Sequence, residues 1–262
     1  MKLIQSRDNP VFKHLRALSD DSRYRREQGA TLLDGVHLIQ AASAAGVVIH
    51  RVAVTAKAMR SQEVQRVVES ALPGRCEVLE LPEPLLRQIS PVDTPAGIVA
   101  EIAIPQHAPT DSQCDMLLIE AVQDAGNLGT LLRTAAAAGV RRALLSQQCA
   151  QAWSPKVLRA GMGGHFSLHI AEGVDLLAAL QDWSGPVLAT ALHARSADLF
   201  SLDLGKPAAW LFGSEGSGLS PALLERATQL VRIPMPGGME SLNVAAAAAV
   251  CLFEQVRQRR QT

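Results

Sequence analysis

Short apolar runs separated by helical patterns fill the second half of the chain, and they limit the folds that it can adopt. The predicted strands lie at Met116–Ala121, Ala143–Ser146, Phe166–Ile170, Val187–Ala191, Ala208–Gly213 and Gln229–Ile233. Nearly continuous apolar strands with helices between them are typical of a parallel sheet that is buried on both faces. The sequence therefore predicts an α/β domain built on a parallel sheet.

A smaller α/β pattern precedes this domain. A helix is predicted over residues 8–28, where Val11, Phe12, Leu15 and Leu18 have helical spacing. Strands are predicted at 31–34, 51–55, 77–81 and 97–102, with helices at 35–45 and 61–72. The polar, proline-containing stretch Ile104–Asp115 is typical of a linker. We therefore predict two domains, residues 1–105 and 112–262.

Basic residues are concentrated near the amino terminus, although the net charge of the chain is zero. Residues 1–60 hold ten Lys and Arg against five Asp and Glu, a local balance of +5. A local cluster of cations binds phosphates even in a neutral protein, because salt screens charges beyond about 8–10 Å. Arg16, Arg23, Arg25 and Arg26 are therefore candidate nucleic-acid contacts. The competing interpretation is the solvated face of an amphipathic helix.

The cysteine and histidine patterns argue against metal sites. Four cysteines (Cys76, Cys114, Cys149 and Cys251) are scattered without a CxxC pair, which favours free thiols in a reducing cytoplasm. His165 and His169 fall in a predicted strand, where residues four apart lie about 13 Å from each other. No run of about 18 apolar residues predicts a membrane span. The first ten residues are too polar for a signal peptide.

Two segments of the second half have the composition of ligand-binding loops. DAGNLGTLLRTA (Asp124–Ala135) follows the first apolar strand, so Asn127 and Arg133 are predicted at the carboxyl edge of the sheet, where ligands bind. LFGSEGSGLS (Leu211–Ser220) carries three glycines that let the backbone approach a ligand closely. Its Glu215 favours a cationic or hydroxyl-bearing ligand over a phosphate.

A third segment, IPMPGGMESLNV (Ile233–Val244), combines two stiffening prolines with a flexible Gly-Gly pair. Ser241 is predicted to cap the helix that starts at Leu242. Asn243 would then lie in the first helical turn with its amide pointing into the site.

Together the three segments resemble the signature of the SpoU (TrmH-like) RNA 2′-O-ribose methyltransferases of the SPOUT class. The resemblance implies a carboxyl-terminal domain with a deep trefoil knot and S-adenosylmethionine as the methyl donor. It implies that Arg133 helps to deprotonate or orient the ribose 2′-hydroxyl. The other implied catalytic positions are Asn127, Glu215, Ser241 and Asn243. The implied cofactor-binding positions are Gly213, Ile233, Leu242, Met235, Glu215, Gly218 and Thr190.

The amino-terminal half resembles the L30e-like substrate-binding domain that is often joined to SpoU domains. The match rests on SRDNPVFKHLRAL (Ser6–Leu18), Arg25–Arg26 and LLDG (Leu32–Gly35). VLRAGMGGHF (Val157–Phe166) is similar to the family's VLRASMGAHF, which adds Arg159 to the candidate RNA contacts. The alanine runs at 135–138 and 245–249 match helices that form the family's homodimer interface.

The sequence thus predicts a cytoplasmic, homodimeric methyltransferase acting on a ribose in ribosomal RNA. A transfer-RNA substrate is the first alternative, because both classes share the signature. A ribosome-assembly factor without catalysis is the second. A nucleotide-binding oxidoreductase is disfavoured by the missing GxGxxG motif. The modified nucleotide, and the choice between naked RNA and an assembling subunit, stay open.

Overall fold

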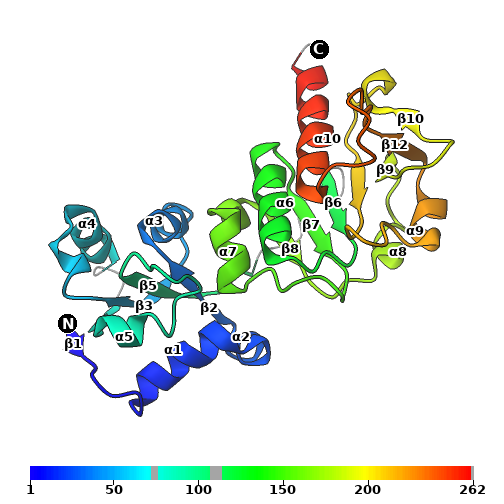
Figure 1. Ribbon diagram of the computed structural model, residues 1–262. Coiled ribbons are helices and arrows are strands. Elements are labelled where there is room, and N and C mark those ends of the chain that lie inside the picture. Colours follow the sequence, from blue (N-terminus) through cyan, green and yellow to red (C-terminus); the bar gives the residue numbers. More distant parts are fainter. Residues whose placement is uncertain (72–75, 107–113, 261–262) are drawn as a thin grey trace. The chain divides into compact units, whose positions relative to one another are not determined.

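The computed structural model describes residues 1–71, 76–106 and 114–260 (Figure 1). Contacts divide them into two compact units. Unit 1 comprises Met1–Gln106 together with Trp153–Phe166, and unit 2 comprises the remaining described residues. The sequence prediction placed Trp153–Phe166 in the second domain, whereas their contacts are with the first. Most of the predicted linker, residues 107–113, lies outside the described residues.

Unit 1 is built on a five-stranded mixed sheet in the order β1-β4-β3-β5-β2. The strands are β1 (Lys2–Leu3), β2 (Ala30–Asp34), β3 (Ile49–Val54), β4 (Glu77–Glu80) and β5 (Ile98–Ala103). β5 runs antiparallel to both of its neighbours, β2 and β3. The four longer strands lie within two residues of the predicted ones, and β1 was not predicted.

Helices cover both faces of this sheet. One face packs against α1 (Pro10–Asp20) and α5 (Glu83–Leu86) through a core that includes Phe12, Leu15, Leu18, Leu32, Leu79 and Leu86. α3 (Val36–Ala44) and α4 (Gln62–Ala71) contact each other and the strands β2, β5 and β3. A short 3-10 helix, η1 (Ala58–Arg60), precedes α4.

The predicted helix over residues 8–28 is in fact two helices. Asp21 adopts an extended conformation between α1 and α2 (Ser22–Gln28). Its carboxylate accepts hydrogen bonds from the backbone N–H groups of Arg23 and Tyr24, so it caps α2. An aspartate that satisfies a new helix start competes with continuation of the first helix.

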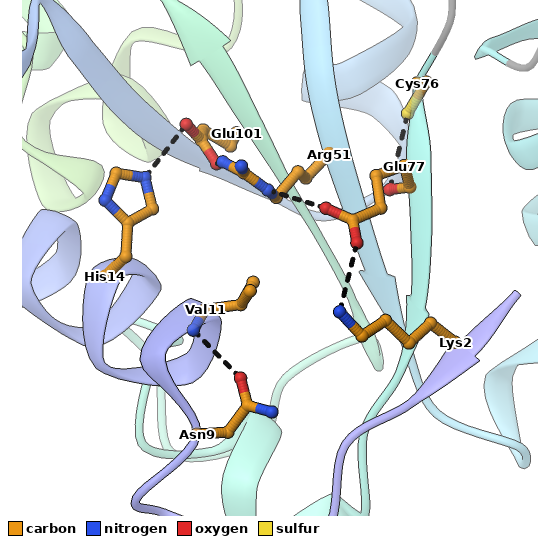
Figure 2. A network of polar contacts seen from close by, with 8 residues as sticks. All are labelled: Lys2, Asn9, Val11, His14, Arg51, Cys76, Glu77 and Glu101. Carbon is orange, nitrogen blue, oxygen red and sulfur yellow. Dashed lines mark hydrogen bonds and ion pairs between the residues drawn. The ribbon is translucent and has the colours of Figure 1, made fainter.

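A row of alternating charges crosses the α1 face of the sheet (Figure 2). Glu101 on β5 accepts a hydrogen bond from Arg51 on β3 at 2.6 Å, and Arg51 also bonds Glu77 on β4 at 3.0 Å. The Nε2 atom of His14 lies 3.0 Å from the second Glu101 oxygen, and its Nδ1 lies 2.9 Å from the Tyr24 hydroxyl. Glu101 is buried, and these partners satisfy both of its oxygens. The network therefore joins α1 and α2 to the sheet.

The segment Trp153–Phe166 is held in unit 1 by polar and close-packed contacts. The buried Thr31 hydroxyl donates to the Trp153 carbonyl at 2.6 Å. Arg159 on α7 (Pro155–Gly161) donates to the buried Asp34 carboxylate at 2.7 Å. A Cβ on Gly163 would lie 2.7 Å from the Ala41 methyl group, so only glycine fits at this approach.

Unit 2 is built on a seven-stranded sheet in the order β10-β12-β9-β11-β6-β7-β8, and every pairing is parallel. The strands are β6 (Met116–Ile119), β7 (Arg142–Leu145), β8 (His169–Ala171), β9 (Val187–Thr190), β10 (Ala197–Asp198), β11 (Ala209–Phe212) and β12 (Gln229–Arg232). This architecture confirms the predicted α/β fold with a parallel sheet.

The two faces of the unit 2 sheet carry different helices. Met116, Leu118, Ala209 and Leu211 form a core with residues of α8 (Leu176–Ala179) and α9 (Pro221–Arg226). Neighbouring residues along a strand point to opposite faces, so Trp210 faces the other way. Its indole N–H donates to Gln255 of α10 (Val244–Arg259) at 2.8 Å. α10 packs beside α6 (Ala125–Ala137) on this second face (Figure 1).

The predicted strand over Phe166–Ile170 is wrong in its first half. Met162 and Gly163 adopt left-handed backbone conformations, and Gly164–Ser167 form a 3-10 helix, η3, before β8 begins at His169. His165 is buried in that 3-10 turn against the Trp153 ring, with 5.4 Å between ring centroids. The two histidines therefore do not share a strand. No described helix has the length and apolar character needed to cross a membrane.

Candidate active site

A chain of side-chain hydrogen bonds joins the three signature segments at the carboxyl edge of the unit 2 sheet. Asn243 donates from Nδ2 to Oδ1 of Asn127 at 2.8 Å. Asn127 in turn donates from Nδ2 to Oε1 of Glu215. Segments that are 88 and 116 residues apart along the chain thus meet through three polar side chains. The structure thus brings together three of the predicted site residues, and Arg133 is not part of this hydrogen-bonded chain.

Asn127 is oriented by the start of α6. Asp124 is the N-cap of this helix, and its carboxylate accepts from the Asn127 backbone N–H at 2.7 Å. With its backbone held there, Asn127 presents its amide to Glu215 on one side and Asn243 on the other. The cap residue was not among the predicted site residues, although an Asp three positions before Asn127 is an ordinary N-cap signal.

Asn243, not Ser241, caps the last helix. α10 begins at Val244, and the Asn243 Oδ1 atom accepts from the backbone N–H groups of Ala245 and Ala246 at 2.9 and 3.3 Å. Ser241 lies two residues earlier, on exposed irregular backbone. The predicted cap was therefore displaced by two residues, because Ser and Asn are both good N-cap residues and the sequence contains both. Asn243 uses its oxygen for the cap and its nitrogen for Asn127.

The Gly213–Gly218 loop folds back tightly on itself. A Cβ on Gly213 would overlap the backbone of Gly218, so no side chain fits at this position. Gly218 donates its N–H to the Ser214 carbonyl at 2.9 Å and has a φ of 65°. Ser214 and Ser217 hydroxyls lie 2.8 Å apart and close the turn. This compact loop leaves the Glu215 side chain exposed.

The remaining predicted cofactor-binding residues follow the neighbouring strands. Thr190 ends β9, and its hydroxyl donates to the Leu211 carbonyl at 3.3 Å. Ile233 directly follows β12, and the Met235 carbonyl accepts from the Gly238 N–H at 3.1 Å in a tight turn. Leu242 exposes 39% of its surface beside the helix cap.

Two further apolar residues near this edge, Leu192 and Met239, are each 70% exposed. The sequence analysis missed both, although each lies inside or next to a segment that it singled out. The Ile233–Asn243 segment, which carries Met239, and the Gly213–Gly218 loop, which carries Glu215, contain no Lys or Arg. Uncovered apolar side chains near an acidic residue suit a ligand with an apolar body and a positive charge. The residues therefore fit S-adenosylmethionine, whose sulfonium is cationic.

Arg133 lies on the exposed side of α6. Its neighbours Leu131 and Leu132 are buried, whereas Arg133 forms no hydrogen bond or ion pair with any described residue of unit 2. The helix places it six residues, or about 1.7 turns, beyond Asn127. The guanidinium is thus available to an external ligand, and its five donors suit a phosphate.

The predicted nucleic-acid arginines of unit 1 fall into two groups. Arg16, Arg23 and Arg26 are exposed, and the first two pair with Asp20 and Glu27 one helical turn away. Arg25 is only 4% exposed, and its Nη1 donates to the carbonyls of Leu18 and Ser19 at 2.7 and 2.9 Å. Arg25 therefore holds the end of α1, and the prediction of an RNA contact at this residue is wrong.

Arg159 has an internal partner in unit 1. Its Nη1 atom forms the ion pair with Asp34, while 44% of the Arg159 side chain stays exposed. Burial raises the pKa of the Asp34 carboxyl, and Ser90 and Arg159 oppose that rise. The pair therefore offsets the desolvation of a buried carboxylate.

Fold and site together define an enzyme class. A glycine-rich loop, an acidic residue and two linked amides meet at the carboxyl edge of a parallel α/β sheet. This arrangement is typical of an enzyme that binds a small-molecule cofactor. Among the described residues, no group of three or more His, Cys, Asp or Glu side chains has the geometry of a metal site.

Comparisons with known proteins identify the family. Residues 116–253 match the SpoU rRNA Methylase family, and residues 9–100 match the MRM3-like substrate binding domain. An uncharacterized tRNA/rRNA methyltransferase of Synechocystis is 37% identical over 98% of this chain and 94% of its own. The 23S rRNA (guanosine(2553)-2′-O)-methyltransferase RlmP of Bacillus subtilis is 29% identical over 97% of this chain and 98% of its own.

A solved structure agrees with this result. The AdoMet-bound rRNA methyltransferase of Sinorhizobium meliloti superposes with a TM-score of 0.83 at 30% identity, covering 98% of this chain and 97% of its own. The chain belongs to the SpoU rRNA methylase family, which confirms the predicted family. It is therefore an RNA 2′-O-ribose methyltransferase that uses S-adenosylmethionine, as the sequence predicted.

Proposed function

We propose that the protein methylates a ribose 2′-hydroxyl in ribosomal RNA, with the transfer site at the Asn243–Asn127–Glu215 chain. That chain is the observation that carries the proposal, because it joins all three signature segments through direct hydrogen bonds. The ribosomal substrate is supported by the full-length similarity to RlmP, whose name specifies 23S rRNA. It is also supported by the substrate-binding domain matched at residues 9–100.

One group of residues in the site is suited to bind the methyl donor. When bound, S-adenosylmethionine supplies a sulfonium methyl group that an oxygen nucleophile can attack. The compact Gly213–Gly218 loop and the residues Ile233, Met235 and Leu242 would hold it, with Thr190 at the adjoining strand end. Glu215 would supply a negative charge in the loop that is proposed to hold this cation, and Asn127 fixes the direction of the Glu215 carboxylate.

Arg133 acts on the RNA side of the reaction. Arginine keeps its proton at neutral pH, so it is a poor base. Its exposed guanidinium is suited to hold the phosphate next to the target ribose and to stabilise the oxygen as its proton leaves. Arg133→Ala is expected to abolish transfer while S-adenosylmethionine binding is unchanged, and Arg133→Lys to restore only part of the rate. Near-wild-type transfer by the alanine variant would contradict this role.

The test of the proposed function is methyl transfer from radiolabelled S-adenosylmethionine into separate pools of unmodified ribosomal and transfer RNA. A methyl group on the 2′-oxygen blocks alkaline cleavage, so label in alkali-resistant dinucleotides identifies ribose methylation. Label in the ribosomal pool alone supports the proposal, and label in the transfer-RNA pool alone replaces its substrate. Cofactor binding without label in either pool favours an assembly factor, once isolated ribosomal subunits have also been tried.

We also propose a homodimer through the α6–α10 face. Phe253 on α10 is 47% exposed, and the small residues Ala137 and Ala246 are exposed on the same helix pair. An uncovered aromatic residue among alanines suits close helix packing. Phe253→Glu is expected to convert a dimer to a monomer in light scattering.

The order of the strands supports a trefoil knot. β11 lies between β9 and β6, and β12 lies between β9 and β10, so two late strands take places between earlier ones. This order is consistent with the knot that the resemblance to the SpoU family implies. We also propose a cytoplasmic location, which is supported by the four cysteines, all of them free thiols.

A further inference from the structure

A cavity of about 310 Å³ opens at the carboxyl edge of the unit 2 sheet. It is bounded by the segments that follow β6, β7 and β8 and by the start of α9. Its size falls at the lower end of small-molecule sites. None of the residues implied in cofactor binding lines it. The cavity is therefore a second place for a ligand.

The lining of the cavity contains both apolar and polar side chains. Val174, Leu177 and Leu223 supply aliphatic side chains. Glu120, Gln147 and Gln148 supply groups that form hydrogen bonds. A flat ring with a polar edge fits such a lining, because its face packs against the aliphatic side chains while its edge meets the polar ones.

The polar side chains of the lining have free hydrogen-bonding capacity. Oε2 of Glu120 accepts from the Ser220 backbone N–H at 2.7 Å, while Oε1 has no hydrogen bond from the described part of the chain. The Gln147 and Gln148 side chains are exposed and make none with the described residues either. The described lining contains no Lys or Arg, so the cavity is not suited to a phosphate.

The chemistry of the free groups selects one RNA base. A carboxylate only accepts hydrogen bonds, whereas a glutamine amide also donates. Guanine is the RNA base with two adjacent N–H donors, at N1 and N2, beside an oxygen acceptor at O6. Glu120 matches the two donors, and a glutamine amide matches the acceptor. In the same two-point contact, uracil, cytosine and adenine would each pair only one donor with the carboxylate and place a neighbouring carbonyl or ring-nitrogen acceptor against its other oxygen.

We propose that this cavity holds a guanine base of the RNA substrate. The proposal rests on the proposed function, since it assigns a base-reading site to the same enzyme. Ser220 ends the second signature segment, and Glu120 lies four residues before the Asp124 cap. The segments that shape the transfer site thus also carry the groups that read the base.

The test compares guanosine with inosine, which lacks the 2-amino group. Short RNAs that contain the mapped methylation site carry inosine at the target position or at either neighbour. Filter binding and kcat/KM for transfer are measured on each RNA. Wild-type protein is expected to prefer guanosine at one position by about tenfold or more, the scale of a bidentate contact to a base.

Glu120→Gln keeps an acceptor for Ser220 but replaces the negative charge with an amide. It is expected to remove the preference for guanosine and to leave S-adenosylmethionine binding unchanged. Gln181→Ala is the matched control, because Gln181 is an exposed glutamine of unit 2 outside the cavity. If Glu120→Gln fails to bind the cofactor, Gln147→Ala and Gln148→Ala are tested by their kcat/KM on the guanosine RNA relative to Gln181→Ala, because their amides are assigned to O6, which inosine also carries.

The outcomes separate the two proposals. Equal use of guanosine and inosine by the wild type at every position overturns the cavity assignment, while transfer itself still supports the proposed function. Absence of transfer to any RNA overturns the proposed function. The preference for guanosine over inosine in filter binding then tests the cavity assignment by itself. A preference for guanosine that survives Glu120→Gln places the base elsewhere. Where the glutamine variants are used instead, kcat/KM values equal to that of Gln181→Ala have the same meaning.

Discussion

Asn243 donates a hydrogen bond to Asn127 at 2.8 Å while its own oxygen caps α10. One side chain thus fixes the start of the last helix and the direction of an amide on the first helix of unit 2. Because Asn127 passes the connection on to Glu215, the helix cap and the acidic residue belong to one hydrogen-bonded chain.

This double role separates stability from activity. Asn243→Asp keeps an oxygen for the cap but faces Asn127 with an acceptor where a donor is needed. We expect an unfolding free energy close to that of the wild type and a transfer rate lowered at least tenfold. Asn243→Ala is expected to lose the cap as well, at a cost of about 1 kcal/mol. Thermal unfolding and single-turnover transfer measure the two effects, and a fully active Asn243→Asp protein would contradict the connection.

The glycine-rich loop offers a sharper contrast between two neighbouring positions. A Cβ at Gly213 overlaps the Gly218 backbone, whereas one at Gly216 meets no atom within 4 Å. Gly213→Ala is therefore expected to open the loop and to weaken S-adenosylmethionine binding at least tenfold in calorimetry. Gly216→Ala is the control and is expected to bind normally. Equal affinities for the two variants would show that the loop does not shape the cofactor site.

The fold was predictable from the sequence where burial determines residue type. Strands such as β6 and β11 are covered on both faces, so their apolar runs predict their positions to within two residues. The order of the strands was not predictable, because the parallel strands have similar apolar sequences that do not indicate which strands are neighbours. The break at Asp21 and the 3-10 turn at Gly164–Ser167 depend on local caps and left-handed residues, which compete with periodic patterns.

The candidate site was predictable in its residue types and less so in its roles. Asn127, Glu215 and Asn243 do meet, but the cap belongs to Asn243 and not to Ser241. The motif contains two suitable cap residues, and only tertiary contact with Asn127 distinguishes them. Arg25 and Arg26 are adjacent and chemically identical, so the sequence does not indicate which one is buried.

The two adjacent arginines of α2 therefore serve as a matched pair. Arg25→Ala leaves the carbonyls of Leu18 and Ser19 without their donor, which is expected to cost ~1.5–3 kcal/mol of stability. Arg26→Ala removes an exposed charge and is expected to leave stability unchanged. It should weaken RNA binding uniformly and reduce its dependence on salt. Chemical denaturation measures the change in stability, and RNA titrations at two salt concentrations measure the change in binding. Equal effects of Arg25→Ala and Arg26→Ala on both quantities would contradict the two separate roles.

The ion pair of Asp34 and Arg159 has a pH dependence whose sign follows from burial. Burial raises the pKa of Asp34, so the folded state holds this proton more tightly than the unfolded state. The contribution of Asp34 to stability is thus greatest below its ordinary value near 3.8 and declines as pH rises through the folded pKa. Arg159 limits this decline because its positive charge stabilises the ionised Asp34 carboxylate. Without Arg159, burying the ionised carboxylate is expected to cost about 1–3 kcal/mol of stability.

We therefore expect Arg159→Ala to lose more stability at pH 7 than at pH 4. Asp34→Asn in the same protein should recover part of that loss, since the neutral amide has no charge to desolvate. Denaturation curves of the wild type, both single variants and the double variant at the two pH values give the coupling free energy. Equal losses at both pH values, without recovery in the double variant, would contradict the stabilising role of the Asp34–Arg159 pair.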